Sequence, residues 1–234
     1  MKSTTAVIAT VLGASLGNAG SSHSTRIPTA LEGHIRTPPN QDCPHAVQWT
    51  SPGRDYVQRL PRWFIKWTTN QVYQALFSDY EQSYIRETSG QILDVGSFFN
   101  LTLPAGSAIQ SIAGINTPIL NDDNSYQLSI NNSPSGNTFS VFGYGYDSFG
   151  AWALVSETPY TTPAIPGGFD ILSASLDGPE NATVSLIREA VQALNCDVLT
   201  GFLQTLNTLK TDDARKGDPP FQCDANCIAN IPPQ

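Results

Sequence analysis

The sequence Pro61-Arg62-Trp63-Phe64-Ile65-Lys66-Trp67 is a short aromatic run. Successive side chains of a strand point to opposite faces of a sheet, so Trp63, Ile65 and Trp67 are expected to point the same way. Polar, proline-containing sequence precedes this run, and repeated short strand-like segments follow it. We therefore expect residues 62–68 to form the first strand of a closed antiparallel sheet whose inner face is apolar.

Further strand-like segments follow at short and fairly even spacing, separated by turn-forming residues. They span residues 79–87, 91–99, 108–116, 125–131, 138–144, 151–157 and 169–175. In the segment 125–131, Tyr126, Leu128 and Ile130 alternate with polar residues, so one face of this strand is expected to be apolar and the other to be polar and solvent-exposed. The pattern indicates an all-β fold, a sandwich or an up-and-down barrel. The alternation favours an eight-stranded antiparallel β-barrel closed over an apolar interior.

One amphipathic C-terminal α-helix is expected after the strands. Asp177-Gly178-Pro179-Glu180 provides a helix start, in which proline is tolerated in the first turn. Val184, Ile187, Val191 and Leu194 then form one apolar stripe at helical spacing. Because this helix has no helical partner, we expect it to pack on the outer surface of the sheet. Other predictions are a helical turn at 55–60, a loop at 70–77 and a short strand at 197–206.

The N-terminal region resembles a secretory signal, with Lys2 before a short apolar run and small residues at 18–20. We predict a signal peptide at 1–19, a flexible leader at 20–42, the barrel with its helix at 43–206, and a C-terminal tail containing cysteines at 207–234. The protein is therefore expected to be secreted and extracellular. No later apolar segment reaches the length that a transmembrane helix needs.

The charge of the chain bears on its partners. The formal net charge is −8 and charged residues make up 14% of the chain. A nucleic-acid surface needs a basic stripe, so no nucleic-acid partner is expected. Three Asn-x-Ser/Thr sequons, at Asn100, Asn131 and Asn181, are candidate glycosylation sites in a secreted chain.

Several segments, in order, resemble the lipocalin family, and apolipoprotein D-like lipocalins in particular. Cys43-Pro44, Val47-Gln48, Asp55-Tyr56-Val57 and Leu60-Pro61-Arg62-Trp63-Phe64 are similar to the family's opening, where a Gly-x-Trp motif follows a short helical turn. Asp147-Ser148-Phe149-Gly150-Ala151-Trp152-Ala153-Leu154-Val155 resembles its second motif, a turn that leads into a strand. Residues 84–90, 110–118 and 169–173 look like its second, fourth and last strands. The resemblance extends from residue 43 to about residue 206.

The chain departs from the family pattern at the closed end of the barrel. Pro61 stands where the family has glycine, while Trp63 matches the family's tryptophan. The arginine of the third motif, which lies across that tryptophan in the family, falls near Ala174 here. We therefore expect Arg59 or Arg62 to cover the closed end instead.

The cysteines also depart from the family. The chain has four, an even number that predicts two disulfides in a secreted protein, with three possible connectivities. The family's usual cysteine early in the second strand is absent. We expect Cys43 to pair with one of the later cysteines, Cys196, Cys223 and Cys227. The pair Cys223 and Cys227 has no second pair to complete a zinc site, so no metal is expected.

Histidine restricts the chemistry that the barrel can perform. The histidines His23, His34 and His45 all precede the first predicted strand, so neither a Ser-His-Asp arrangement nor a His-bound metal is expected inside the barrel. The strand carboxylates Asp79, Glu81, Glu87 and Asp94 are expected to be solvated residues of the outer face. We therefore predict no catalytic residues and no cofactor.

The predicted function is to bind and transport a small hydrophobic ligand in the barrel interior, of the fatty acid, retinoid, sterol or tetrapyrrole class. The candidate lining residues are Trp67, Tyr73, Phe77, Tyr84, Tyr126, Leu128, Phe142 and Trp152. Two alternatives stay open: a lipocalin-scaffold enzyme, such as an isomerase or de-epoxidase that uses a thiol or an acid pair, and a secreted interaction module with a filled barrel.

Overall fold

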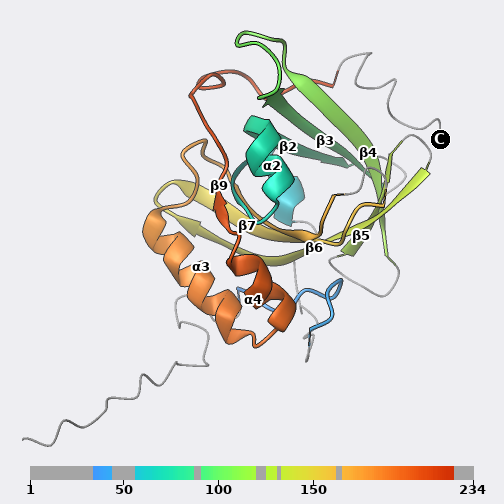
Figure 1. Ribbon diagram of the computed structural model, residues 1–234, viewed down its shortest axis with the longest axis vertical. Coiled ribbons are helices and arrows are strands. Elements are labelled where there is room, and N and C mark those ends of the chain that lie inside the picture. The colour runs from blue at the N-terminus through green and yellow to red at the C-terminus, as the bar shows by residue number, and fades with distance from the viewer. Residues whose placement is uncertain are drawn as a thin grey trace, which may run out of the picture.

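The computed structural model describes residues 34–43, 56–86, 91–119, 125–130, 133–161 and 165–223. Its strands form one nine-stranded antiparallel sheet in the order β2-β3-β4-β5-β6-β7-β8-β1-β9, and β1 also pairs with β2 (Figure 1). Because β1 is bonded to both β2 and β8, the sheet closes on itself. The predicted up-and-down barrel is therefore confirmed.

All the predicted barrel strands are present, with ends that differ by a few residues. Their bounds are β1 Trp63–Thr68, β2 Phe77–Arg86, β3 Ile92–Asn100, β4 Gln110–Pro118, β5 Ser125–Ile130, β6 Ser133–Asp147, β7 Gly150–Glu157 and β8 Gly168–Ser173. A short ninth strand, β9 Asn207–Thr208, pairs with the end of β1. The turn-forming residues therefore predicted the ends of the strands well, because the chain changes direction between strands where glycine, asparagine or proline occurs.

The helices confirm some predictions and overturn others. The turn η2 Val57–Arg59 and the long helix α3 Asn181–Ala193 lie where the sequence predicts them. Residues 70–77 were expected to be a loop, but they contain the helix α2 Gln71–Leu76. The side chain of Asn70 caps this helix by accepting hydrogen bonds from the backbone N–H groups of Val72 and Tyr73. The predicted strand at 197–206 is wrong, because the chain there forms α4 Asp197–Leu203.

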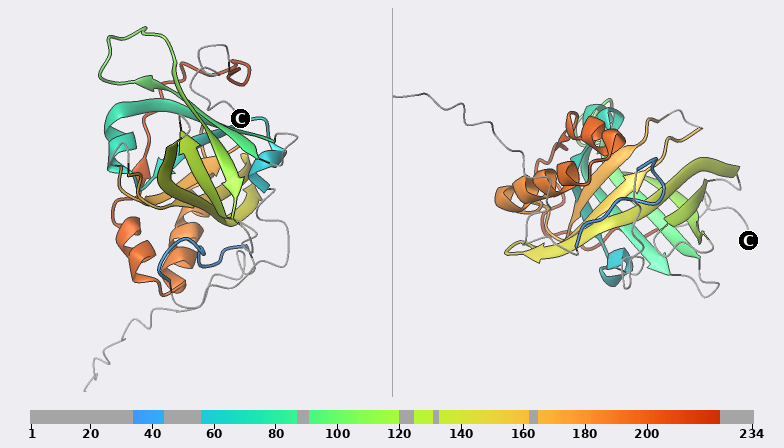
Figure 2. Two further views of the ribbon diagram at one scale, coloured as in Figure 1. Left: turned by 90° about the vertical axis from the view of Figure 1, so that its right-hand side faces the viewer. Right: turned by 90° about the horizontal axis from the view of Figure 1, so that it is seen from below.

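Two hydrophobic cores lie on the two faces of the barrel wall. The inner core includes Trp63, Ile65 and Phe139, which point into the barrel. The outer core joins Trp152 and neighbouring strand residues to the apolar side of α3. Figure 2 shows α3 and α4 together on the outside of the barrel, as predicted for the long helix.

A β-bulge in β1 changes the direction of Trp67. The pairing of β1 with β8 shifts register between Ile65 and Trp67. A bulge inserts an extra residue, so the side chains beyond it change faces. Trp67 consequently packs against the outer core, with the guanidinium of Arg188 5.5 Å from its ring centroid. The expectation that Trp63, Ile65 and Trp67 all point inward is corrected.

The segment before the barrel is docked on it from His34 onward. Ile35 forms a bridge with Gly143, and the amide of Asn40 donates to two backbone carbonyls, those of Thr138 and Ser156. The leader at 20–42 was expected to be flexible, and its last residues are instead hydrogen-bonded to β6 and β7. The Cys43–Cys196 disulfide joins this segment to the start of α4. It is consistent with the predicted pairing of Cys43 with a later cysteine.

The tail that follows β9 also packs on the barrel. Lys210 forms a parallel bridge with Ser78, and Arg215 is almost fully buried. Phe221 and Cys223 pack against a small cluster on the outer face of β3 and β4. Up to residue 223 the predicted tail is therefore a covering layer of the fold.

Candidate ligand-binding site

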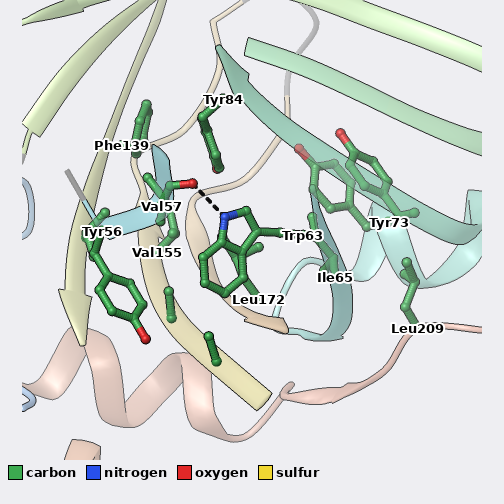
Figure 3. Packing of buried hydrophobic residues seen from close by; sticks show 14 of the residues in the cluster. Tyr56, Val57, Trp63, Ile65, Tyr73, Tyr84, Phe139, Val155, Leu172 and Leu209 are labelled. Atoms are coloured by element: carbon green, nitrogen blue, oxygen red, sulfur yellow. Dashed lines mark hydrogen bonds between the residues drawn. The ribbon is translucent and has the colours of Figure 1, made fainter. Parts of the chain in front are cut away.

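Trp63 closes one end of the barrel. Its indole Nε1 donates to the carbonyl oxygen of Val57 at 2.6 Å, and its ring centroid lies 5.9 Å from that of Tyr56 (Figure 3). The side chain is fully buried. The turn η2 therefore covers Trp63 with an aromatic ring and a backbone carbonyl, and Trp63 has a structural role at this end.

Of the two arginines expected to cover the closed end, Arg59 lies there and Arg62 does not lie over Trp63. The Arg59 guanidinium is 5.7 Å from the centroid of the Tyr56 ring, and that of Arg62 is 4.9 Å from the Phe64 ring. Arg59 thus covers the ring that contacts Trp63, one layer further out. Ala174, where the family arginine falls, packs directly against the inner core.

Four aromatic rings form a stack at the other end of the interior, where α2 joins β2. The ring of Tyr73 on α2 lies 5.6 Å from that of Tyr80 in a stacked geometry, and Phe77 lies 3.9 Å from Phe98. The Tyr80 hydroxyl occupies the space that a Cβ would take at Gly96, so glycine is needed there. Tyr73 of α2 and the rings of β2 and β3 thereby form an apolar, aromatic layer over the interior.

A second aromatic pair lies between the stack and Trp63. The rings of Tyr84 and Phe139 are 5.6 Å apart, and Figure 3 shows both beside Trp63. Burial raises the pKa of the Tyr84 hydroxyl well above its ordinary value, so it is a neutral hydrogen-bonding group at physiological pH. The interior therefore combines apolar rings with phenol hydroxyls.

Asp94 points into this interior. It lies opposite Tyr84 in the pairing of β2 with β3. Its carboxylate accepts hydrogen bonds from the amides of Gln82 and Asn116, the latter at 2.6 Å. Burial raises the pKa of Asp94 from 3.8 to about 7, although the bond from Asn116 lowers it. The expectation that Asp94 is a solvated residue of the outer face is therefore wrong.

Two further carboxyls, which the sequence analysis did not identify, face the same interior. Glu157 lies opposite Phe139, and Asp170 lies opposite Val155, and both partners belong to the inner core. Burial raises the pKa of Asp170 to about 7. The pKa of Glu157 is raised by burial and by repulsion from Asp170 and Asp94. The sequence signal that could have found them is their position: each acid alternates with mostly apolar residues along a predicted strand and so shares a face with inward side chains.

The other strand acids are also buried, but on the outside of the barrel. Glu81 contacts Arg215, and Asp79 accepts from the backbone N–H of Asp212. The C-terminal tail covers both, which a reading of β2 alone does not reveal. Glu87 lies outside the described residues.

The predicted lining residues divide into three groups. Tyr73, Phe77 and Tyr84 belong to the inner core. Trp67, Phe142 and Trp152 belong to the outer core beneath the helices, so they do not line the interior. Tyr126 and Leu128 lie on β5, where the structure describes no side chains.

The three outward side chains have specific causes. The bulge in β1 turns Trp67 outward, whereas Phe142 directly follows the inward Val141 and points outward by the ordinary alternation of β6. Trp152 alternates with the inward residues of β7. The inner residues that sequence reasoning missed are Tyr80, Asp94, Phe98, Phe139, Glu157, Tyr160 and Asp170.

The remaining predicted features are placed as follows. Asn181 is exposed at the start of α3, and the Asn100 side chain accepts from Thr102, whereas Asn131 lies outside the described residues. Cys223 is disulfide-bonded, and Cys227 lies outside the described residues.

Among the residues that the structure describes, no group of three or more His, Cys, Asp or Glu side chains is placed to hold a metal ion. No helix in that part of the chain is both long and apolar enough to cross a membrane.

The closed barrel, the tryptophan at its sealed end and the helix on its outer wall define a lipocalin fold. The major allergen Per a 4 from cockroaches has a similar structure, with a TM-score of 0.51 at 13% sequence identity over 74% of this chain and 98% of that chain. The siderocalin Ex-FABP is similar with a TM-score of 0.47 at 9% identity, over 66% of this chain and 95% of that chain. No protein-family model and no curated protein matches this chain.

Proposed function

We propose that this protein is a secreted lipocalin that binds a small hydrophobic molecule inside its barrel and transports it. The observation that carries the proposal is the aromatic interior between Trp63 and α2, built from Tyr73, Tyr84 and their neighbours. Binding is expected to be driven by removing apolar ligand surface from water, at roughly 25 cal/mol per Å² before the entropic costs of association. The tyrosine hydroxyls would orient polar groups of the ligand.

Secretion is supported by the cysteines. Cys43, Cys196 and Cys223 are all disulfide-bonded, and disulfides persist in oxidising compartments. The same observation removes the basis for a thiol-dependent enzyme at these three positions. We further propose that Asn100 and Asn181, at the surface, carry glycans in the secreted protein.

The experiment is a binding panel on delipidated protein, with fatty acids, retinoids, sterols and tetrapyrroles followed by tryptophan quenching. Trp63 is the natural reporter, since it lies beside Tyr84 and Phe139. Tyr84→Leu should weaken binding of whichever class is bound. The matched control is Tyr146→Leu, because the Tyr146 side chain is 71% exposed and should not affect affinity. Absence of binding by every one of these classes, and by hydrophobic amines and alcohols, would overturn the proposal.

A further inference from the structure

Carboxyl groups project into the interior from two opposite parts of the barrel wall. Asp94 lies on β3, while Glu157 and Asp170 lie on β7 and β8, which are separated from β3 in the sheet order. Among the described residues, the ion pairs involve Glu81 and Asp213, and none involves these three acids. These three carboxyl groups therefore have no cationic partner in the described part of the protein.

Asn116 provides an independent observation at the same place. It lies opposite Ile92, a member of the inner core, so its side chain is on the inner face of β4. The side chain is completely buried, and its amide nitrogen donates to Asp94. Within the described residues, its Oδ1 has no hydrogen-bond partner. A buried acceptor without a donor is costly, so a ligand that brings N–H groups would satisfy it.

The groups around Asp94 suit a cation with an apolar body. Tyr84 is its direct cross-strand neighbour, and Gly114 lies opposite it on β4, so no side chain projects toward it from that position. The faces of aromatic rings attract cations, and most strongly where water is excluded. A carboxylate, an amide oxygen and aromatic rings are the groups that hold an ammonium ion.

We propose that the ligand of this barrel is an organic cation, a protonated amine on a hydrophobic body, whose ammonium group is held by Asp94 and the Oδ1 of Asn116. The inference rests on the proposed function, because it names the class of molecule that the same interior takes. Glu157 and Asp170 add negative potential from the opposite wall. Anionic ligands, such as fatty acid carboxylates, are correspondingly disfavoured in this position.

Proton linkage gives the proposal a second readout. The titratable groups that face the interior are Asp94 on β3, Glu157 on β7, Asp170 on β8, Tyr80 and Tyr84 on β2, Tyr73 on α2, and Tyr160 after β7. The tyrosines stay neutral, because burial raises each pKa well above its ordinary value. A bound ammonium ion stabilises the ionised form of the carboxyl groups around it. Binding near pH 7 should therefore release protons from Asp94 and Asp170, whose pKa values are about 7.

The test uses three probes that share one chain: decylammonium, decanol and decanoate, titrated into delipidated protein by calorimetry at pH 8. Decylammonium should bind about tenfold or more tightly than decanol, and decanoate should bind most weakly. Affinity for decylammonium should fall from pH 8 to pH 5, where the amine itself stays protonated. Near pH 7, titrations in buffers of different ionisation enthalpy should show proton release.

The variant Asp94→Asn separates this inference from the proposed function. It should reduce the preference for decylammonium over decanol and the proton release. The exposed Asp177→Asn is the control and should retain both. If decanol binds and decylammonium binds no more tightly, the cation inference fails while the proposed function stands. If no probe binds, and the fatty acids, retinoids, sterols and tetrapyrroles do not bind either, the proposed function fails as well.

Discussion

The guanidinium of Arg215 lies 2.8 Å from Oε2 of Glu81, and both side chains are 1% exposed. The contact is an ion pair by distance, without the alignment of a hydrogen bond. Arg215 also donates to the hydroxyl of Ser97 at 2.8 Å, and the other Glu81 oxygen accepts from the N–H of Phe221 at 2.6 Å. The C-terminal tail is thus fastened to the outside of β2 and β3 by a buried charge pair.

Removing one partner of this pair should destabilise the protein strongly. Arg215→Ala leaves the buried Glu81 with only the longer, 3.7 Å contact to the partly exposed Arg62, at a cost of about 3–5 kcal/mol in the free energy of unfolding. Urea unfolding measures the effect. Lys216→Ala is the control, because Lys216 and Asp213 are 66% and 60% exposed and such pairs contribute about 0–1 kcal/mol. Equal effects of the two variants would contradict a structural role for the tail.

Asp94→Asn should stabilise the unliganded protein at pH 8 and have little effect at acid pH. The folded pKa of Asp94 is raised from 3.8 to about 7, so the folded state holds the proton more tightly than the unfolded state. The corresponding stability is fully present below about pH 4 and is lost as the pH rises through 7. The complete loss is on the order of 4 kcal/mol.

Asparagine removes this loss, and the Asn116 amide can turn over to present its oxygen to the new amide group. Urea midpoints at pH 5 and pH 8 test the sign of the effect. A wild-type protein that is more stable than Asp94→Asn at pH 8 would show that the ionised carboxylate is satisfied in the folded state.

Trp152→Phe should affect stability and leave ligand binding unchanged. Trp152 is buried beneath α3 in the outer core, so the smaller ring should leave a defect that costs about 1–3 kcal/mol. Affinity for the ligand found in the panel should stay within about twofold of the wild type, whereas Tyr84→Leu lowers it. Calorimetric titration and thermal unfolding of the same samples make the comparison. A loss of affinity in Trp152→Phe as large as in Tyr84→Leu would place Trp152 in the site.

The Cys43–Cys196 disulfide should stabilise the docking of the leading segment. It joins residues 153 positions apart in the sequence, with Cα atoms 5.0 Å apart. Replacing both cysteines by serine should lower the free energy of unfolding by about 2–4 kcal/mol. Hydrogen exchange should also increase at Arg36, whose N–H donates to the carbonyl of Phe142. An unchanged urea midpoint would show that the bond adds nothing to the fold.

Local sequence signals were enough to locate the strands, their order along the chain and the long helix. The turn residues between strands and the apolar stripe of α3 are local signals, and each acts over a few residues. The aromatic run with Trp63 marked the start of the barrel correctly for the same reason. Tyr73, Phe77 and Tyr84 were recognisable as buried residues because of their large aromatic rings, but burial alone does not separate the inner core from the outer core in which Trp152 lies.

The face that each side chain occupies and the burial of the charged groups depended instead on contacts made in the folded barrel. A bulge at Lys66 reverses the direction of Trp67, and no local pattern marks it, since the extra residue is accommodated by pairing with β8. In the sequence Asp94 resembles a solvated acid of a strand, but closure of the sheet into a barrel buries it in the interior. Glu81 is buried only because a tail more than a hundred residues away carries Arg215 to it. Burial and pairing of charge depend on contacts between distant segments, which the order of residues does not display.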